Sequence, residues 1–214
     1  MSQPLVNLTF HGIGSPARPL DPGEQAVWVS RERFLAVLDA VAGRDGVRVT
    51  FDDGNRSDLT TALPALRDRG LTGTFFVVAG RLGEPEFLDE DDVRALAGAG
   101  MTVGSHGMRH RAWRALDAAA LREEVVDAKA RLETVLERPV TEAACPFGSY
   151  GRRSLGALRD AGFRRVYTSD RGHASADAWI QARTTITEES PLEPILAGET
   201  SLTRRAKRVI KQWR

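Results

Sequence analysis

Two adjacent carboxylates are the first groups in this sequence that could do chemistry. Asp52 and Asp53 follow a short apolar run at residues 47–51, and Gly54 allows a sharp turn after them. Two neighbouring carboxylates repel each other when buried, so such a pair needs a cation or a shared proton. One aspartate could bind a metal while the other takes a proton from water. Taken alone, the motif is more typical of an exposed Asp-Asp-Gly turn.

Two histidines four residues apart form the second group. His106 and His110 lie in the segment SHGMRH (residues 105–110), directly after the apolar residues 101–104. Neutral imidazoles are the commonest metal ligands, and this spacing suits a single ion. The chain has only four histidines and two of them fall here. This favours a metal site over a pair of exposed histidines on one helical turn.

The third group is the loop CPFGSY at residues 145–150, after a predicted strand at 140–144. Pro146 and Gly148 fix a tight loop, which can point a backbone N–H at an oxyanion. By itself it is an ordinary strand-to-helix loop. Because all three motifs follow predicted strands, we expect them to meet at one rim of a parallel sheet. Two histidines and one carboxylate would there form a three-ligand metal site with a position open to water.

The elements that must position these groups alternate between short apolar runs and helical patterns. Strands are predicted at residues 5–10, 47–51, 72–78, 101–104, 140–144 and 165–168, with two further short strands at 179–182 and 184–186. Helices are predicted between them, at residues 31–42, 59–69, 90–100, 118–137 and 152–161. This alternation predicts an α/β fold with a parallel sheet, and its length favours an incomplete (β/α) barrel over an open sheet.

Size and composition predict one globular domain over residues 1–200, followed by a basic tail or helix at 201–214. The chain has 214 residues, of which 42% are hydrophobic and 28% charged, with a formal net charge of +1. The tail holds six of the basic residues, so the rest of the chain is acidic and does not suggest a nucleic-acid-binding protein. The tail could touch an anionic membrane surface weakly, although a solvated terminal helix is the favoured interpretation.

The sequence also predicts a cytoplasmic protein. The single cysteine, Cys145, cannot form an intrachain disulfide. Residues 1–10 lack the pattern of a secretory signal, and no apolar run is long enough to span a bilayer.

Taken in order, the motifs TFDDG (residues 50–54), SHGMRH (105–110) and PFG (146–148) resemble the polysaccharide deacetylase family, also called the NodB-homology or carbohydrate esterase family 4 domain. The resemblance extends from the first strand to about residue 183. It implies a distorted (β/α) barrel, usually of seven strands. It also implies a divalent metal, most often zinc, and hydrolysis of N-acetyl groups on N-acetylglucosamine-type sugars. Cobalt and nickel would suit the same ligands.

The resemblance also assigns roles to individual residues. It implies that Asp52 is the catalytic base and that Asp53, His106 and His110 bind the metal. The N–H of Phe147, which follows Pro146, would help to hold the oxyanion. Two aromatic residues near the motifs could stack on a sugar face: these are Trp113, for which core packing is an equal alternative, and Tyr150.

The chain departs from the family pattern at two places. The family commonly has an arginine two residues before the proline of the third motif, where it orients the base, but this chain has Ala144. The family's usual C-terminal motif, which supplies a histidine as general acid, is not visible either. The late histidine, His173, has neighbours that do not match that motif. His11 follows the first predicted strand and resembles the N-terminal acid of the poly-N-acetylglucosamine deacetylase branch. A structural histidine at a strand end is the alternative.

Three functions therefore follow from the sequence. The first is a metal-dependent deacetylase acting on an N-acetylated sugar or glycan precursor, including a lipid-linked or nucleotide-linked one. The second is a metal-dependent amidase acting on a small non-sugar amide. The third is a non-catalytic sugar-binding protein on a degenerate barrel, which the loss of the arginine and of the late motif would suit.

Overall fold

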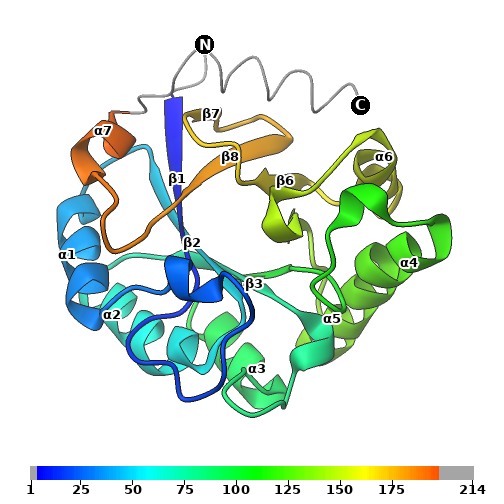
Figure 1. The fold of residues 1–214 in the computed structure, drawn as a ribbon, viewed down its shortest axis with the longest axis horizontal. Coiled ribbons are helices and arrows are strands. Elements are labelled where there is room, and N and C mark those ends of the chain that lie inside the picture. The colour runs from blue at the N-terminus through cyan, green and yellow to red at the C-terminus, as the bar shows by residue number, and fades with distance from the viewer. Residues whose placement is uncertain (1–3, 198–214) are drawn as a thin grey trace.

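A closed barrel of parallel strands forms the centre of the molecule, as the computed structural model of residues 4–197 shows (Figure 1). The strands of the described part are β1 (Pro4–Phe10), β2 (Val47–Asp53), β3 (Gly73–Val77), β4 (Thr102–Ser105), β5 (Glu142–Ala144), β6 (Arg165–Thr168), β7 (Ala174–Ser175) and β8 (Ile180–Thr185). Their order is β2-β3-β4-β5-β6-β8-β1, and β1 also pairs with β2. All of these pairings are parallel, so seven strands close the barrel. The predicted distorted (β/α) barrel is therefore confirmed.

Helices surround the barrel between successive strands (Figure 1). They are α1 (Arg31–Val41), α2 (Leu63–Asp68), α3 (Glu90–Gly98), α4 (Ala118–Arg122), α5 (Ala128–Leu136), α6 (Arg152–Asp160) and α7 (Leu192–Leu196). Ser30, Asp89 and Asp117 cap the N-termini of α1, α3 and α4, because each side chain accepts a hydrogen bond from a backbone N–H in the first helical turn. None of the helices in the described residues is long and apolar enough to cross a bilayer.

Some element predictions were wrong in detail. The two strands expected at 179–182 and 184–186 are one strand, β8, which runs through Arg183. The helix predicted from 118 to 137 contains a π-helical turn, Glu123–Asp127, between α4 and α5, and a second π turn, Asp58–Ala62, precedes α2. The predicted tail at 201–214 lies outside the described residues, so its role stays a prediction.

The inside of the barrel holds polar side chains beside a small cluster of Phe76, Ala144 and Tyr167, whereas the shell between strands and helices is apolar. Successive residues of a strand face opposite sides. Phe10 and Phe51 are partners across β1 and β2, and both pack on Phe34 of α1, which places them on the helix side. Their neighbours Thr9 and Thr50 therefore point inward, and their hydroxyls lie 2.9 Å apart. This polar interior can receive charged side chains close to the site.

The aromatic cluster of the outer shell is a main source of stability. Phe51 is fully buried, and its ring lies 4.4 Å from that of Phe75 and 5.8 Å from that of Phe10. We expect Phe51→Ala to lower the free energy of unfolding by about 3–5 kcal/mol, because it removes a packed ring and leaves a cavity. Urea unfolding followed by circular dichroism measures this. Phe147→Ala is the control, since Phe147 is 70% exposed and its loss should change stability little. Equal losses in both variants would contradict this account of the core.

Candidate metal centre and active site

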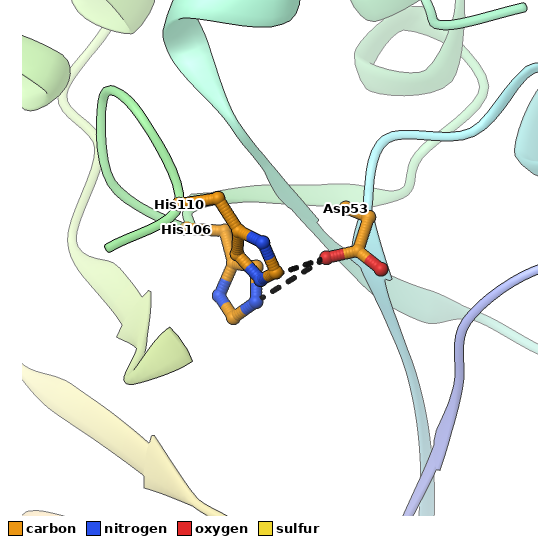
Figure 2. A group of neighbouring side chains, drawn as sticks. All are labelled: Asp53, His106 and His110. Carbon is orange, nitrogen blue, oxygen red and sulfur yellow. Dashed lines mark ion pairs between the residues drawn. The ribbon is translucent and has the colours of Figure 1, made fainter. Parts of the chain in front are cut away.

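Three side chains from two strand ends converge on one point (Figure 2). Asp53 is the last residue of β2, and His106 and His110 lie on the loop after β4. The Nε2 atoms of His106 and His110 lie 3.6 Å and 3.2 Å from Asp53 Oδ1. Ligands of a tetrahedral zinc ion with bonds near 2.0–2.1 Å stand roughly 3.3 Å apart. The spacing of these atoms therefore suits a single divalent ion.

Hydrogen bonding and burial prepare both imidazoles to act as ligands. The carbonyl of Ala144 lies 2.9 Å from Nδ1 of His106, and a proton donated there leaves a lone pair on Nε2. Burial, and then the neighbouring His106, lower the pKa of His110 to about 4 against a smaller opposing effect of Asp53. His110 is thus neutral near pH 7, which is the form that binds metals.

Asp53 supplies the observation that tests whether a metal fits. Its Oδ1 is buried, and no donor in the described part of the chain meets it with hydrogen-bond geometry. A buried carboxylate oxygen without a partner is costly, whereas a cation at that point would satisfy it. The backbone of Asp53 and of His110 also has a positive φ angle, 79° and 55° respectively. Residues other than glycine adopt such angles rarely and mostly at functional sites. The residues present therefore fit a divalent metal.

Asp52 lies beside this cluster and forms a bidentate ion pair with Arg183. The two guanidinium nitrogens donate to its two carboxylate oxygens at 2.6 Å and 2.7 Å, and both side chains are almost fully buried. Burial alone would raise the pKa of Asp52, but the charge of Arg183, then the charge of His106 and the hydrogen bonds of Arg183, outweigh it and hold that pKa well below its usual range. Asp52 is consequently ionised throughout the neutral range.

Arg183 is the residue that the sequence analysis missed. It reaches Asp52 from β8, and its guanidinium lies over Phe76 at 5.2 Å and Tyr167 at 5.8 Å. Those two rings form one inner cluster with Ala144, the position where the family commonly has its arginine. A signal was present: a single charged residue inside an otherwise strand-like stretch at 179–186. The sequence analysis divided this stretch into two predicted strands at Arg183. A charged side chain that is buried in a strand is, however, either paired or functional.

A third buried carboxyl lies close to the two aspartates. Asp58 is fully buried, and neither of its oxygens has a hydrogen-bond partner within the described residues. Burial, followed by the negative charges of Asp53 and Asp52, raises the pKa of Asp58 well above its usual range. This shift favours the protonated form of Asp58.

A cavity of about 500 Å³ opens onto the cluster and contains most of the predicted site residues. Its lining includes His11, Asp52, Phe147 and the three candidate ligands. His11 Nε2 lies 3.9 Å from Asp52 Oδ2, so the two groups could act on one bound molecule. Phe147 has a positive φ of 56°, and its ring lies 4.5 Å from that of His110. Pro146 is buried directly behind it.

The structure does not bring Trp113 and Tyr150 to the cavity. Trp113 is 1% exposed and its indole N–H donates to Glu124, while Tyr150 is fully buried and its hydroxyl donates to Asp170. A ring that is covered on both faces cannot stack on a sugar. The expected stacking therefore does not fit either side chain, and Trp113 takes the alternative of core packing.

Glu124 organises the loop that carries both histidines. This fully buried carboxylate accepts hydrogen bonds from the backbone N–H groups of Met108 and Arg109, at 3.2 Å and 3.0 Å, and from the side chain of Arg111 at 2.9 Å. A Cβ at Gly107 would lie only 2.3 Å from its Oε2. Sequence reasoning gave no signal for Glu124, because a glutamate within a helix is usually exposed.

Replacing Arg183 tests how Asp52 is held. The Asp52–Arg183 pair stabilises the wild type fully at pH values above the pKa of Asp52 in the unfolded chain, which is about 4. This contribution is lost only as the pH falls through the much lower pKa of Asp52 in the folded chain. We expect Arg183→Met to cost about 3–5 kcal/mol of stability at pH 7, because it leaves a buried charge alone. Metal content should not change, and the acid limb of the activity profile should move to higher pH. Urea unfolding, metal analysis and a pH series measure these effects.

Arg165→Met is the matched control for that experiment. Arg165 also pairs with a carboxylate, that of Glu142, but it lies outside the cavity and is more exposed. An unchanged pH profile in Arg183→Met would show that Arg183 does not set the protonation of Asp52.

Replacing Glu124 tests the organisation of the loop. In Glu124→Gln one carboxylate oxygen is replaced by an amide N–H₂, which cannot accept a hydrogen bond from the surrounding N–H groups. We therefore expect metal affinity to fall about 10–100-fold, as for other residues that support metal ligands. Competition with a chelator measures the affinity. Glu123→Gln is the control, because Glu123 is only partly buried and its ion pairs among the described residues are with Arg109 and Arg111. Equal affinities in the two variants would contradict the role of Glu124.

Comparison with known proteins agrees with this geometry. The model of the family described as polysaccharide deacetylase matches residues 40–166. YxkH of Bacillus subtilis strain 168, named as a polysaccharide deacetylase, is 25% identical over 162 residues, which are 76% of this chain. The chain spans 58% of the length of that relative.

Solved structures show the same fold. The deacetylase PplD of Streptococcus pyogenes, in complex with acetate, superposes with a TM-score of 0.79 at 20% identity, covering 94% of this chain and all of that one. IcaB from Ammonifex degensii gives a TM-score of 0.75 at 25% identity, covering 91% of this chain and 96% of that one. Since the family model spans more than half of the sequence, this chain belongs to the polysaccharide deacetylase family.

Proposed function

We propose that this protein is a metal-dependent hydrolase that removes N-acetyl groups from an N-acetylglucosamine-type sugar or glycan precursor. One observation carries the proposal: two imidazoles and Asp53 meet round one point while a second, ionised carboxylate stands beside them. A site that only bound a sugar would not need a base next to a metal. Zinc is the proposed ion, with cobalt or nickel as alternatives.

A divalent ion held by Asp53, His106 and His110 would polarise a water molecule and the acetamide carbonyl. Asp52 is the proposed base, because its Oδ2 lies 3.7 Å from Nε2 of His106 and faces the same cavity. It accepts a proton from the water that adds to the carbonyl carbon. Arg183 keeps Asp52 ionised and fixes both of its oxygens, so the base does not need to move.

His11 is the proposed acid for the second half of the reaction. It reaches the cavity from the end of β1, and its buried Nδ1 has no hydrogen-bond partner among the described residues. Its Nε2 lies 3.9 Å from Asp52 Oδ2, and a proton given from there to the amine nitrogen as the C–N bond breaks would make the amine a better leaving group. The products are acetate and a free amine. The N–H of Phe147 is the proposed donor to the oxyanion.

The comparisons support this proposal. The solved structure of PplD is a deacetylase in complex with acetate, which is the acid product expected here. Several other solved structures of the same fold are also described as deacetylases, among them a de-N-acetylase from Aggregatibacter actinomycetemcomitans. The substrate of this chain, its metal and a cytoplasmic location stay proposals.

Variants of the metal cluster and of the base test the assignment. We expect His106→Ala to lose bound metal and acetate release together, because it removes a ligand. Asp52→Asn should keep the metal but lose about 10²–10⁴-fold in rate, the range that a general base contributes. Metal analysis and acetate release from N-acetylglucosamine oligomers measure both effects. His173→Ala, which lies outside the cavity lining, is the control.

The outcomes separate the competing functions. Near-normal turnover in Asp52→Asn would show that Asp52 is not the base. Bound metal with acetate release from simple amides but not from sugars would identify an amidase. Bound metal with no acetate from any substrate would identify a sugar-binding protein.

A further inference from the structure

Resting on the proposed function, we propose that this enzyme deacetylates the N-acetylated sugar at the end of a chain, or a single free N-acetylated amino sugar. The reason is that residues 14–28 close one side of its site. We call these residues the roof loop. They connect the end of β1 to α1 and include a short 3-10 helix, Glu24–Val27. In Figure 1 this segment lies in front of the central strands.

The roof loop lines the same cavity as the metal cluster. Asp21, Pro22, Gly23, Glu24 and Val27 contribute to its lining, together with the candidate ligands. A bound molecule must therefore lie between the loop and the cluster. The cavity volume of about 500 Å³ falls in the lower half of the range for pockets that enclose one small ligand. It suits one sugar or a short piece of a chain.

Arg18 fixes the roof loop to the part of the chain that carries the metal ligand. Its guanidinium pairs with Glu24 within the loop and donates to Asn55 Oδ1 at 2.9 Å. Asn55 is 1% exposed and follows Asp53 by two residues. The guanidinium also lies over the ring of Phe87 at 4.4 Å. The loop is therefore preformed, and moving it would break a partly buried ion pair and a cation–π contact.

The two stems of the loop are also held. The N–H of Gly14 donates to Val29 at 2.8 Å, and the N–H of Val29 donates to Gly12 at 3.1 Å. The indole of Trp28 packs so closely on Gly12 that a Cβ there would lie 1.9 Å from the ring. Loops closed at both ends in this way keep their shape. A polymer would have to displace the roof loop in order to pass through the cavity.

The cavity reaches the protein surface at Phe147. This residue lines the cavity yet is 70% exposed, and it is the exposed large hydrophobic side chain among the described residues. The remainder of a sugar chain would leave past this ring. One closed side and one open side give a site that receives the end of a chain.

The charges of the roof loop favour an uncharged terminal sugar. Glu24 is paired with Arg18, and Asp21 is paired with Arg81 at 2.9 Å, so the lining that these residues provide is balanced. A phosphate group in the cavity would need a free cation. Among the described lining residues, Arg81 is the only arginine or lysine, and it is already paired. A nucleotide-linked sugar is therefore not the expected ligand.

The test uses the full-length, zinc-loaded protein and N-acetylglucosamine oligomers of increasing length. Acetate release is counted per molecule, and tandem mass spectrometry locates the free amine. We expect one acetate per oligomer, always from the same terminal unit. Several acetates per oligomer, or free amines at internal units, would overturn the inference alone. No acetate from any oligomer or from the free sugar would contradict the proposed function as well.

A variant of Arg18 tests the roof loop directly. Arg18→Met removes the pair with Glu24 and the bond to Asn55, so we expect the preference for the terminal unit to weaken and internal amines to appear, with unchanged zinc content. Arg69→Met is the matched control, because Arg69 pairs with Asp39 and lies outside the cavity lining. If Arg18→Met does not fold, Glu24→Gln weakens the same pair. If the variants with a weakened Arg18–Glu24 pair still deacetylate only the terminal sugar, the roof loop does not cause this preference.

Discussion

The ion pair between Asp52 and Arg183 is the interaction on which the site depends. Burial next to a second carboxylate favours the protonated form of a carboxyl group, and it raises the pKa of Asp58 close by. Arg183 prevents this at Asp52 with two charge-assisted hydrogen bonds. The free energy of folding thus maintains an ionised carboxylate in a place from which water is largely excluded. A less complete pairing would favour the protonated form of Asp52.

The closure of the barrel is what makes this pair possible. β1 lies between β2 and β8 and pairs with both, so the interior side chains of β2 and β8 meet across it. Thr50 accepts a hydrogen bond from Arg183 at 3.2 Å and lies 2.9 Å from Thr9 of β1. The polar interior satisfies the guanidinium, while the aromatic shell outside supplies most of the hydrophobic stability. An open sheet would leave Arg183 and Asp52 on separate edges.

The sequence predicted the barrel and most of the candidate site because these depend on local signals. Strand ends, N-caps and glycines fixed the places of Asp53, His106 and His110 at one rim, and the structure brings all three together. Arg183 and Glu124 were missed because their roles arise only from tertiary contacts. A glutamate in a π turn looks exposed in a helical pattern, and an arginine in a strand looks like the end of that strand. Burial, which decides both cases, is not a local property.

Ala144 and the guanidinium of Arg183 share one region of the barrel interior. Ala144 packs with Phe76 and Tyr167, and Arg183 places its guanidinium over those same two rings. A long side chain at position 144 would compete with Arg183 for that space, so only one of the two positions can carry the arginine. What chemistry requires is a guanidinium on both oxygens of the base, and any neighbouring strand whose side chains point inward can supply it. The loss of a motif residue at one position is therefore weak evidence for a degenerate site, as long as the interior still places a cation on Asp52.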